Sequence, residues 1–188
     1  MTRDTIITLP NPHLRHKSRP IKIIDQTVLQ LIDDMQSATL DWEDHRQHEF
    51  GVALAAVQID RLYRIVIIRN NFEDKDDRSF ITLINPKVIK AEGKPVFDQE
   101  GCLSVKDLYG LVPRYPKVRV SAIGSDGNEL RIRAEGFLAR VLQHEIDHTN
   151  GILFIDHIKQ QDAFFHLTKK GELIKVNHEK ILQSSILW

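Results

Sequence analysis

The sequence is short of cysteine, of long apolar runs and of charge of one sign. Cys102 is the only cysteine among the 188 residues, so no internal disulfide can form and a reducing compartment is indicated. No stretch of about 18 apolar residues occurs, which excludes a membrane-spanning helix of the usual length. Lys and Arg number 26 and Asp and Glu number 26, so no net charge draws the chain toward nucleic acid or an anionic membrane.

These absences predict a cytoplasmic protein that has no membrane or nucleic-acid partner and binds its ligand through a local site. The N-terminal segment lacks the basic stretch followed by an apolar stretch that marks a signal peptide. The length fits one globular domain with a sizeable core. We therefore expect a monomer with a single domain over residues 1–188, of which residues 158–188 form a peripheral C-terminal tail.

Two segments have the spacing of apolar residues that is typical of amphipathic helices. The first is residues 23–40, near the N-terminus. The second is residues 137–149, which Asn150-Gly151 follows as a stop signal. A weaker helical pattern lies in the tail, at residues 164–173.

Between the two helices the chain is rich in short β-branched segments. Asp126-Gly127 predicts a tight hairpin turn, Asn85-Pro86 predicts a break between two strands, and the polar stretch at residues 70–78 predicts a hairpin loop. The order of helix, strands and helix favours the α+β class, with mainly antiparallel strands around a central second helix and an amphipathic N-terminal helix. The predicted strands are residues 63–68, 80–84, 87–90, 118–123 and 129–133.

The second predicted helix contains an H-E-x-x-H pattern, from His144 to His148. Residues four apart lie on the same face of a helix, so both imidazoles can bind one cation while Glu145 reaches a water molecule beside it. The same pattern also arises by chance on helix surfaces rich in His and Glu. Alone, it does not decide the function.

Cys102 is the candidate for a third ligand. It could be a small buried apolar residue, but it follows Gly101, and glycine lets the backbone approach a metal closely. With His144 and His148 it would supply three protein ligands and leave the fourth position open, which is typical of a catalytic metal. A cation there would polarise a carbonyl, and Glu145 could move a proton from water to a leaving amine, so the set predicts amide hydrolysis.

A third segment, residues 51–58, is small and apolar until Gln58. Such a segment is typical of a tightly packed strand or turn. Small residues also let a bound peptide backbone come close, and Gln58 offers an amide N–H to a developing oxyanion. Both interpretations stay open for this segment.

Together the three segments resemble the peptide deformylase family, whose motifs are G-x-G-L-A-A-x-Q, E-G-C-L-S and H-E-x-D-H in this order. The second and third match at every position, and the resemblance extends from about Leu9 to Asp156. It implies an α+β fold and the removal of the formyl group from formyl-methionine of new polypeptides, at the ribosome. The matching segments are Gly51 to Gln58, Glu100 to Ser104 and His144 to His148.

The resemblance also implies roles for single residues. Glu145 would be the general acid and base, while Gln58 and the backbone N–H of Leu103 would stabilise the tetrahedral intermediate. The bound metal would commonly be Fe²⁺, which Zn²⁺, Ni²⁺ or Co²⁺ can replace. The implied metal ligands are Cys102, His144 and His148. The expected substrate contacts are Gly51, Val52, Ala53, Phe137, Arg140 and Val141.

Two further expectations concern charged residues near the metal ligands. Glu100 needs a partner if the segment before Cys102 is to be rigid, and we expect Arg114 to be this partner. Arg140 is expected to line the pocket mouth with its guanidinium in solvent, where it would favour acidic peptides. The alternative is that Arg140 lies on the surface and pairs with Glu135.

The sequence departs from the family pattern at three positions that affect substrate binding. Ala53 replaces the second glycine of the first motif, Lys106 stands where many relatives have proline, and Tyr109 falls where an arginine often holds the peptide. Two alternatives therefore stay open. One is a zinc endopeptidase that takes its third ligand downstream, such as Glu172 or His178, and the other is a translation-associated binding module that keeps a metal but has lost turnover.

Overall fold

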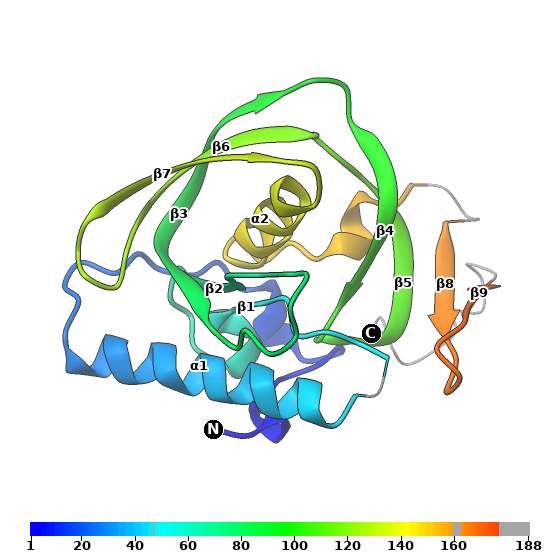
Figure 1. Ribbon diagram of the computed structural model, residues 1–188, viewed down its shortest axis with the longest axis horizontal. Coiled ribbons are helices and arrows are strands. Elements are labelled where there is room, and N and C mark those ends of the chain that lie inside the picture. Colours follow the sequence, from blue (N-terminus) through cyan, green and yellow to red (C-terminus); the bar gives the residue numbers. More distant parts are fainter. Residues whose placement is uncertain (47, 160–162, 177–188) are drawn as a thin grey trace.

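The computed structural model describes residues 1–46, 48–159 and 163–176. Its strands form two antiparallel sheets, ordered β1-β2-β3-β6-β7 and β4-β5-β8-β9, and helix α2 lies between them (Figure 1). Helices combined with antiparallel sheets confirm the α+β class. In the described part of the chain, no helix is long and apolar enough to span a membrane.

The elements have the following bounds. The helices are α1 (Gln26–Asp44) and α2 (Gly136–His148), with short 3-10 helices η1 (Arg3–Thr5), η2 (Pro12–Arg15), η3 (Ala56–Ile59) and η4 (Phe154–His157). The five-stranded sheet contains β1 (Ala53–Ala55), β2 (Ile65–Arg69), β3 (Phe80–Glu92), β6 (Lys117–Ile123) and β7 (Glu129–Glu135). The four-stranded sheet contains β4 (Val96–Cys102), β5 (Val105–Arg114), β8 (Phe164–Leu167) and β9 (Leu173–Val176).

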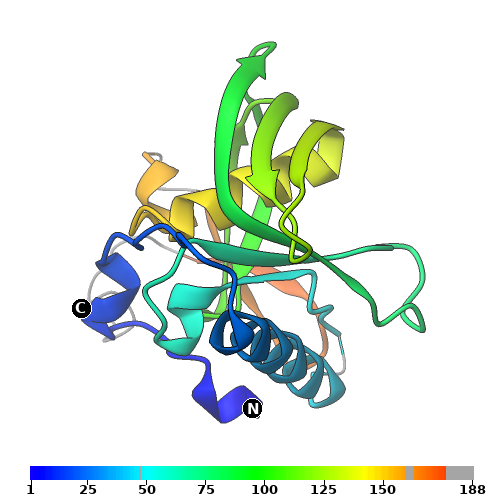
Figure 2. The same ribbon diagram turned by 90° about the vertical axis from the view of Figure 1, so that its left-hand side faces the viewer.

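Helix α1 begins and ends a few residues later than the spacing of apolar residues predicts. Its start is fixed by Asp25, whose side chain accepts a hydrogen bond from the backbone N–H of Val28. Its apolar stripe, which includes Ile32 and Met35, is buried against the sheet. The helix thus covers the face of β1 and β2 that lies away from α2 (Figure 2).

Strand β2 is buried along its whole length because a helix packs on each side of it. Val66 and Ile68 join the apolar cluster that contains α2, whereas Ile65 and Ile67 join the cluster that contains α1. Alternate residues of a strand point to opposite faces, so its run of four apolar residues, Ile65 to Ile68, serves both clusters. This central position holds β1, and the segment that follows it, firmly beside α2.

The break predicted at Asn85-Pro86 is wrong, because β3 runs through it. Asn85 adopts a positive φ of 53°, and its side-chain amide exchanges two hydrogen bonds with the backbone of Ile21. The pairing with β6 shifts register between Ile84 and Lys87, as expected for a bulge. The two predicted strands are therefore one long strand with an irregularity at this point.

Two other parts of the chain differ from expectation. The long hairpin of β4 and β5 was not among the predicted strands, although it carries Cys102 at one end. The helix predicted at residues 164–173 is wrong, since β8 and β9 form there and β8 pairs with β5. His178, a candidate ligand, lies outside the described residues.

The other two turns that the sequence predicts are present in the structure. The turn at Asp126-Gly127 joins β6 to β7, with Gly127 at a φ of 84°, and so confirms the predicted hairpin. The polar stretch at residues 70–78 joins β2 to β3 and projects from the body of the molecule, which confirms the predicted loop (Figure 2).

One buried ion pair links α1, β2 and the segment before β1. The side chain of Arg69 is completely buried between the rings of Phe50 and Phe80, and it donates to both carboxylate oxygens of Glu43, at 3.0 and 3.1 Å. The Nε and Nη1 atoms of Arg69 have no hydrogen-bond partner among the described residues. Glu43 also accepts the backbone N–H of Gly51 at 2.9 Å.

We therefore expect Glu43→Ala to lower the free energy of unfolding by about 3 kcal/mol or more, because it leaves a buried guanidinium without a counterion. The neighbouring Asp44→Ala is the matched control. Asp44 pairs with Arg78 in an exposed contact, so its loss should cost less than about 1 kcal/mol. Urea unfolding of both variants measures the difference, and equal losses would show that the Arg69 pair does not stabilise the fold.

Candidate metal centre

Helix α2 presents two imidazoles toward the space between the sheets. The helix starts at Gly136, directly after β7, where a positive φ of 60° turns the chain. Its residues from 139 to 146 are all buried, as a helix enclosed on several sides requires. The rings of His144 and His148 lie edge to face with centroids 4.9 Å apart. One turn of helix has therefore placed both rings beside each other.

The turn between β4 and β5 brings Cys102 to these rings. The Sγ atom of Cys102 lies 3.3 Å from Nε2 of His148, and the candidate ligand atoms of Cys102, His144 and His148 all lie within 4.8 Å of one another. In His144 the Nδ1 atom contacts Glu100, which leaves Nε2 for a ligand. A thiolate with two imidazoles suits zinc or a first-row transition metal, and these three residues could hold one.

The electrostatics of His148 fit this use. Burial lowers the pKa of His148 well below its usual value and favours the neutral imidazole, which is the form that binds a metal. Burial also disfavours the charged form of His144, but hydrogen bonds to Cys102 and Glu100 outweigh it and raise the pKa of His144. The two buried imidazoles and the adjacent thiol of Cys102 are the kind of donor set that a metal site requires.

A buried carboxylate, Glu100, stands behind His144. Its Oε2 atom contacts Nδ1 of His144 at 2.9 Å, and both its oxygens accept hydrogen bonds from Arg114, at 2.9 and 3.1 Å. Burial opposes the charge on Glu100, yet the contacts with His144 and Arg114 hold its pKa far below the usual range. The predicted pairing of Glu100 with Arg114 is confirmed. Arg114 also binds Asp147, which in turn contacts His157 at 2.7 Å.

The expected place of the Arg140 guanidinium, in solvent or paired with Glu135, is wrong. Arg140 is only 7% exposed, and its Nη1 donates to Glu100 at 2.7 Å and to the carbonyl of Val112 at 2.8 Å. Its Nη2 donates to the carbonyl of Val96, also at 2.8 Å. The side chain therefore ties α2 to both strands of the β4–β5 hairpin, where bonds to carbonyls and a carboxylate offset the cost of burying its charge.

Glu145 lies next to His144 and faces the same space. Burial raises its pKa to about 7, and its Oε2 atom has no hydrogen-bond partner among the described residues. In the metal-free protein this carboxyl group can thus either hold or release a proton near neutral pH. Such a group is suited to proton transfer in an enclosed site.

Gln58 comes from η3, on the other side of the candidate ligands. Its Oε1 accepts the backbone N–H of Ala55, which fixes the amide and aims Nε2 at Ser104 Oγ and Cys102 Sγ, at 3.1 and 3.5 Å. Leu103 follows Cys102 and lines the same pocket. The amide N–H of Gln58 thus lies beside the candidate ligand Cys102, in the same pocket as His144 and Glu145.

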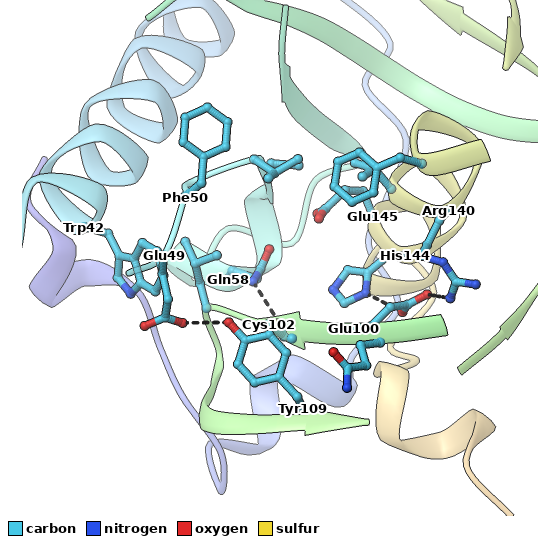
Figure 3. Close-up of a pocket in the computed structure, with 17 residues that line it drawn as sticks. Trp42, Glu49, Phe50, Gln58, Glu100, Cys102, Tyr109, Arg140, His144 and Glu145 are labelled. Atoms are coloured by element: carbon cyan, nitrogen blue, oxygen red, sulfur yellow. Dashed lines mark hydrogen bonds and ion pairs between the residues drawn. The ribbon is translucent and has the colours of Figure 1, made fainter. Parts of the chain in front are cut away.

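These residues surround a pocket of about 220 Å³ (Figure 3). Of the residues expected to contact a substrate, Val52, Ala53, Phe137, Arg140 and Val141 line it. Gly51 is not in the lining. A Cβ atom there would come within 2.9 Å of Cγ2 of Thr39, so this glycine allows close packing on α1 instead.

Four lining residues were not singled out from the sequence, namely Trp42, Glu49, Phe50 and Gln99. Glu49 and Phe50 directly precede the segment at residues 51–58, and this adjacency is the one signal that could have indicated them. Tyr109 also lines the pocket, and its hydroxyl donates to Glu49 at 3.0 Å. Trp42 comes from the last turn of α1, which no local pattern connects with the other lining residues.

Comparison with known proteins agrees with this arrangement. A model of the polypeptide deformylase family matches residues 3–164. The peptide deformylase of Thermomicrobium roseum is 42% identical over 171 residues, which cover 89% of this chain and 93% of the relative. That of Halothermothrix orenii is 45% identical over 148 residues, which cover 79% and 88%.

Solved structures agree as well. A peptide deformylase from Legionella pneumophila superposes with a TM-score of 0.71 at 38% identity, covering 82% of this chain and 85% of that one. The enzyme from Synechococcus elongatus, in complex with actinonin, superposes with a TM-score of 0.74 at 34% identity, covering 83% and 80%. The chain described here therefore belongs to the polypeptide deformylase family.

Proposed function

We propose that this protein is a metal-dependent deformylase that removes the formyl group from formyl-methionine at the N-terminus of new polypeptides. The observation that carries the proposal is the contact of Cys102 with the two histidines of α2, in a chain of this family. In it, Cys102, His144 and His148 bind the metal. Three protein ligands leave a position open for water or substrate, as catalysis requires.

The residues around the ligands have distinct roles in this proposal. A divalent cation held there would polarise the formyl carbonyl and make water more acidic. Glu145 takes the proton of the attacking water and delivers it to the leaving amine, for which its raised pKa is suited. Gln58 Nε2 and the backbone N–H of Leu103 donate to the oxyanion as the carbonyl carbon becomes tetrahedral.

We propose that the expected residues that line the pocket bind the substrate. Val52 and Ala53 offer backbone to the peptide, while Phe137 and Val141 form an apolar wall for the methionine side chain. Arg140 supports this wall from behind through its bonds to β4 and β5.

The finer features of the proposal are the identity of the metal and the setting in which the enzyme works. We propose Fe²⁺, which suits a mixed set of thiolate and imidazoles, with Zn²⁺, Ni²⁺ or Co²⁺ as substitutes. The protein would act as a monomeric cytoplasmic enzyme on nascent chains at the ribosome. It would form one domain over residues 1–188, to which the expected peripheral tail contributes strand β8 beside β5.

Two alternatives have less support. A zinc endopeptidase of the H-E-x-x-H class would take its third ligand downstream, whereas here the thiol of Cys102 already completes a set of three ligand atoms. A binding module without turnover would need no poised proton carrier, yet Glu145 is buried beside the ligands with one oxygen unpartnered among the described residues. The deformylase accounts for both observations.

The proposed function is tested by adding formyl-Met-Ala-Ser to the metal-loaded protein and measuring the release of formate. We expect turnover of this peptide and no cleavage of its internal peptide bonds. Glu145→Gln should keep the metal but reduce kcat by about 10³-fold or more, because the ligands remain and the proton carrier does not. Metal content is measured on the same samples.

Cys102→Ala is the matched variant for the ligand assignment, and it should lose the metal. An endopeptidase with a downstream ligand would instead keep its metal in Cys102→Ala. Near-normal turnover in Glu145→Gln would show that this carboxyl group is not the proton carrier.

A second prediction concerns the arginines that hold Glu100. Arg114→Ala should weaken the affinity for Zn²⁺ about ten-fold or more, because Glu100 then orients His144 less firmly. Arg140→Leu should act in the same direction. Competition with a chromogenic chelator measures the affinity, and Arg78→Ala, which removes an exposed arginine, is the control. Unchanged affinity in both variants would contradict a role of these arginines in positioning the ligands.

A third prediction concerns the metal. Protein loaded anaerobically with Fe²⁺ should be more active than protein loaded with Ni²⁺, but it should lose activity faster in air. Oxygen can oxidise the ferrous iron and then the ligating sulfur of Cys102. Activity and the mass of the peptide containing Cys102 are followed over time in air. Equal lifetimes of the two forms would count against iron.

A further inference from the structure

One part of the pocket wall lies outside the helices and strands of the fold. Trp42, Glu49 and Phe50 lie on one side of the view in Figure 3, which we call the outer end of the pocket. Residues 49–52 run between α1 and β1 and belong to neither. Phe50 and Val52 of this segment both line the pocket. Their position against a bound substrate must therefore come from individual contacts with the rest of the fold.

The carboxylate of Glu43, on α1, holds the middle of this segment. Its Oε2 atom accepts the backbone N–H of Gly51 at 2.9 Å. The backbone can come this close to α1 only without a side chain, because a Cβ atom on Gly51 would lie 2.9 Å from Cγ2 of Thr39. Glu43 thus fixes the backbone between the two lining residues, Phe50 and Val52.

The buried guanidinium of Arg69 holds the same segment from the side of β2. It donates to both carboxylate oxygens of Glu43, and its Cζ atom lies 4.7 Å from the centroid of the Phe50 ring. The backbone N–H of Arg69 donates to the carbonyl of Val52 at 2.7 Å. One arginine therefore contacts both lining residues and the carboxylate that binds Gly51 between them.

Stability alone does not account for a charged pair in this place. Two apolar side chains of similar size often stabilise a fold as well as a buried ion pair does, because removing the charges from water cancels much of their attraction. The Nε and Nη1 atoms of Arg69 lack partners among the described residues, which adds to this cost. Apolar side chains could not, however, accept the N–H of Gly51. The distinct contribution of the pair is therefore to the geometry of the segment.

We propose that Glu43 and Arg69 are positioning residues for substrate binding, which act by holding Phe50 and Val52 in place at the pocket. This inference rests on the proposed function. In the described part of the chain, neither side chain lines the pocket or bonds to a candidate metal ligand. Loosening the segment should therefore weaken the binding of substrate and transition state alike, which raises KM and leaves kcat nearly unchanged.

The test uses two double variants, because a change of Glu43 alone leaves a buried guanidinium unpaired. The first, Glu43→Leu with Arg69→Met, removes both charges together and fills their space, so it should fold. The second, Glu43→Gln with Arg69→Met, removes the same charges but keeps an oxygen that can accept from Gly51. With formyl-Met-Ala-Ser and metal-loaded protein, KM should rise about ten-fold in the first and about three-fold in the second, while kcat stays within about two-fold.

Val28→Ala is the control for a general loss of stability. Val28 is buried in the first turn of α1, at the end of the helix away from Glu43. Its truncation should lower the free energy of unfolding without changing KM. Urea unfolding is measured on all variants. Calorimetric titration of the metal-loaded proteins with the product peptide Met-Ala-Ser gives a second measure that needs no turnover, and its Kd should rise by the same factors as KM.

An unchanged KM and Kd in the first double variant would overturn the inference. Equal values in the two double variants, or a rise of the same size in Val28→Ala, would overturn it too, because the acceptor for Gly51 would then have no separate effect. Absence of turnover by the unaltered protein would overturn the proposed function instead, and the Kd of Met-Ala-Ser would still decide whether the pair positions the segment.

Discussion

The site depends on the buried carboxylate of Glu100. It accepts hydrogen bonds from Arg114 on β5 and Arg140 on α2, and it contacts the ring of His144. These contacts join the helix that carries two candidate ligands to the hairpin that carries the third, Cys102. Without this carboxylate two guanidinium groups would face each other in a buried space, where like charges repel strongly. The relative position of all three candidate ligands thus follows from one charged group.

This network need not be the source of the fold's stability. Buried ion pairs often gain little over apolar packing, since the cost of removing the charges from water cancels much of their attraction. Apolar burial is supplied elsewhere, by the sandwich in which β2 separates the cluster around α1 from the cluster around α2. A well-packed scaffold can therefore support a polar site whose geometry matters more than its contribution to folding.

Much of the arrangement follows from local sequence patterns. The two helices, the hairpin after β6 and the three-residue cluster of candidate ligands could be predicted because each depends on spacing or on one motif. Strand β4 could not, because acidic residues and Gly101 interrupt its apolar pattern, and its exposed residues need no apolar side chains. The Asn85-Pro86 pair did not mark the end of a strand. The side-chain amide of Asn85 makes two hydrogen bonds with the backbone of Ile21, which stabilise the irregular backbone at this point.

Residues whose surroundings come from distant parts of the chain were the hardest to place. For Arg140, the helical position alone could not reveal four acceptors on β4 and β5, so solvent was the expected place for its charge. For the same reason, the only local signal for Glu49 was its place before residues 51–58, since its partner Tyr109 is 60 positions away along the chain.

The two kinds of charge in the pocket differ in what they can do. The inner charges of Arg114, Arg140 and Glu100 are buried and matched with one another, so a bound peptide finds few of their hydrogen-bonding groups free. They can orient the metal ligands but contribute little to a choice among peptides. The carboxylate of Glu49 also lines the pocket, and it shares its guanidinium partner, that of Arg46, with Asp107. The charges at this outer end of the pocket are thus less completely matched than those of the inner network, which orients the candidate metal ligands.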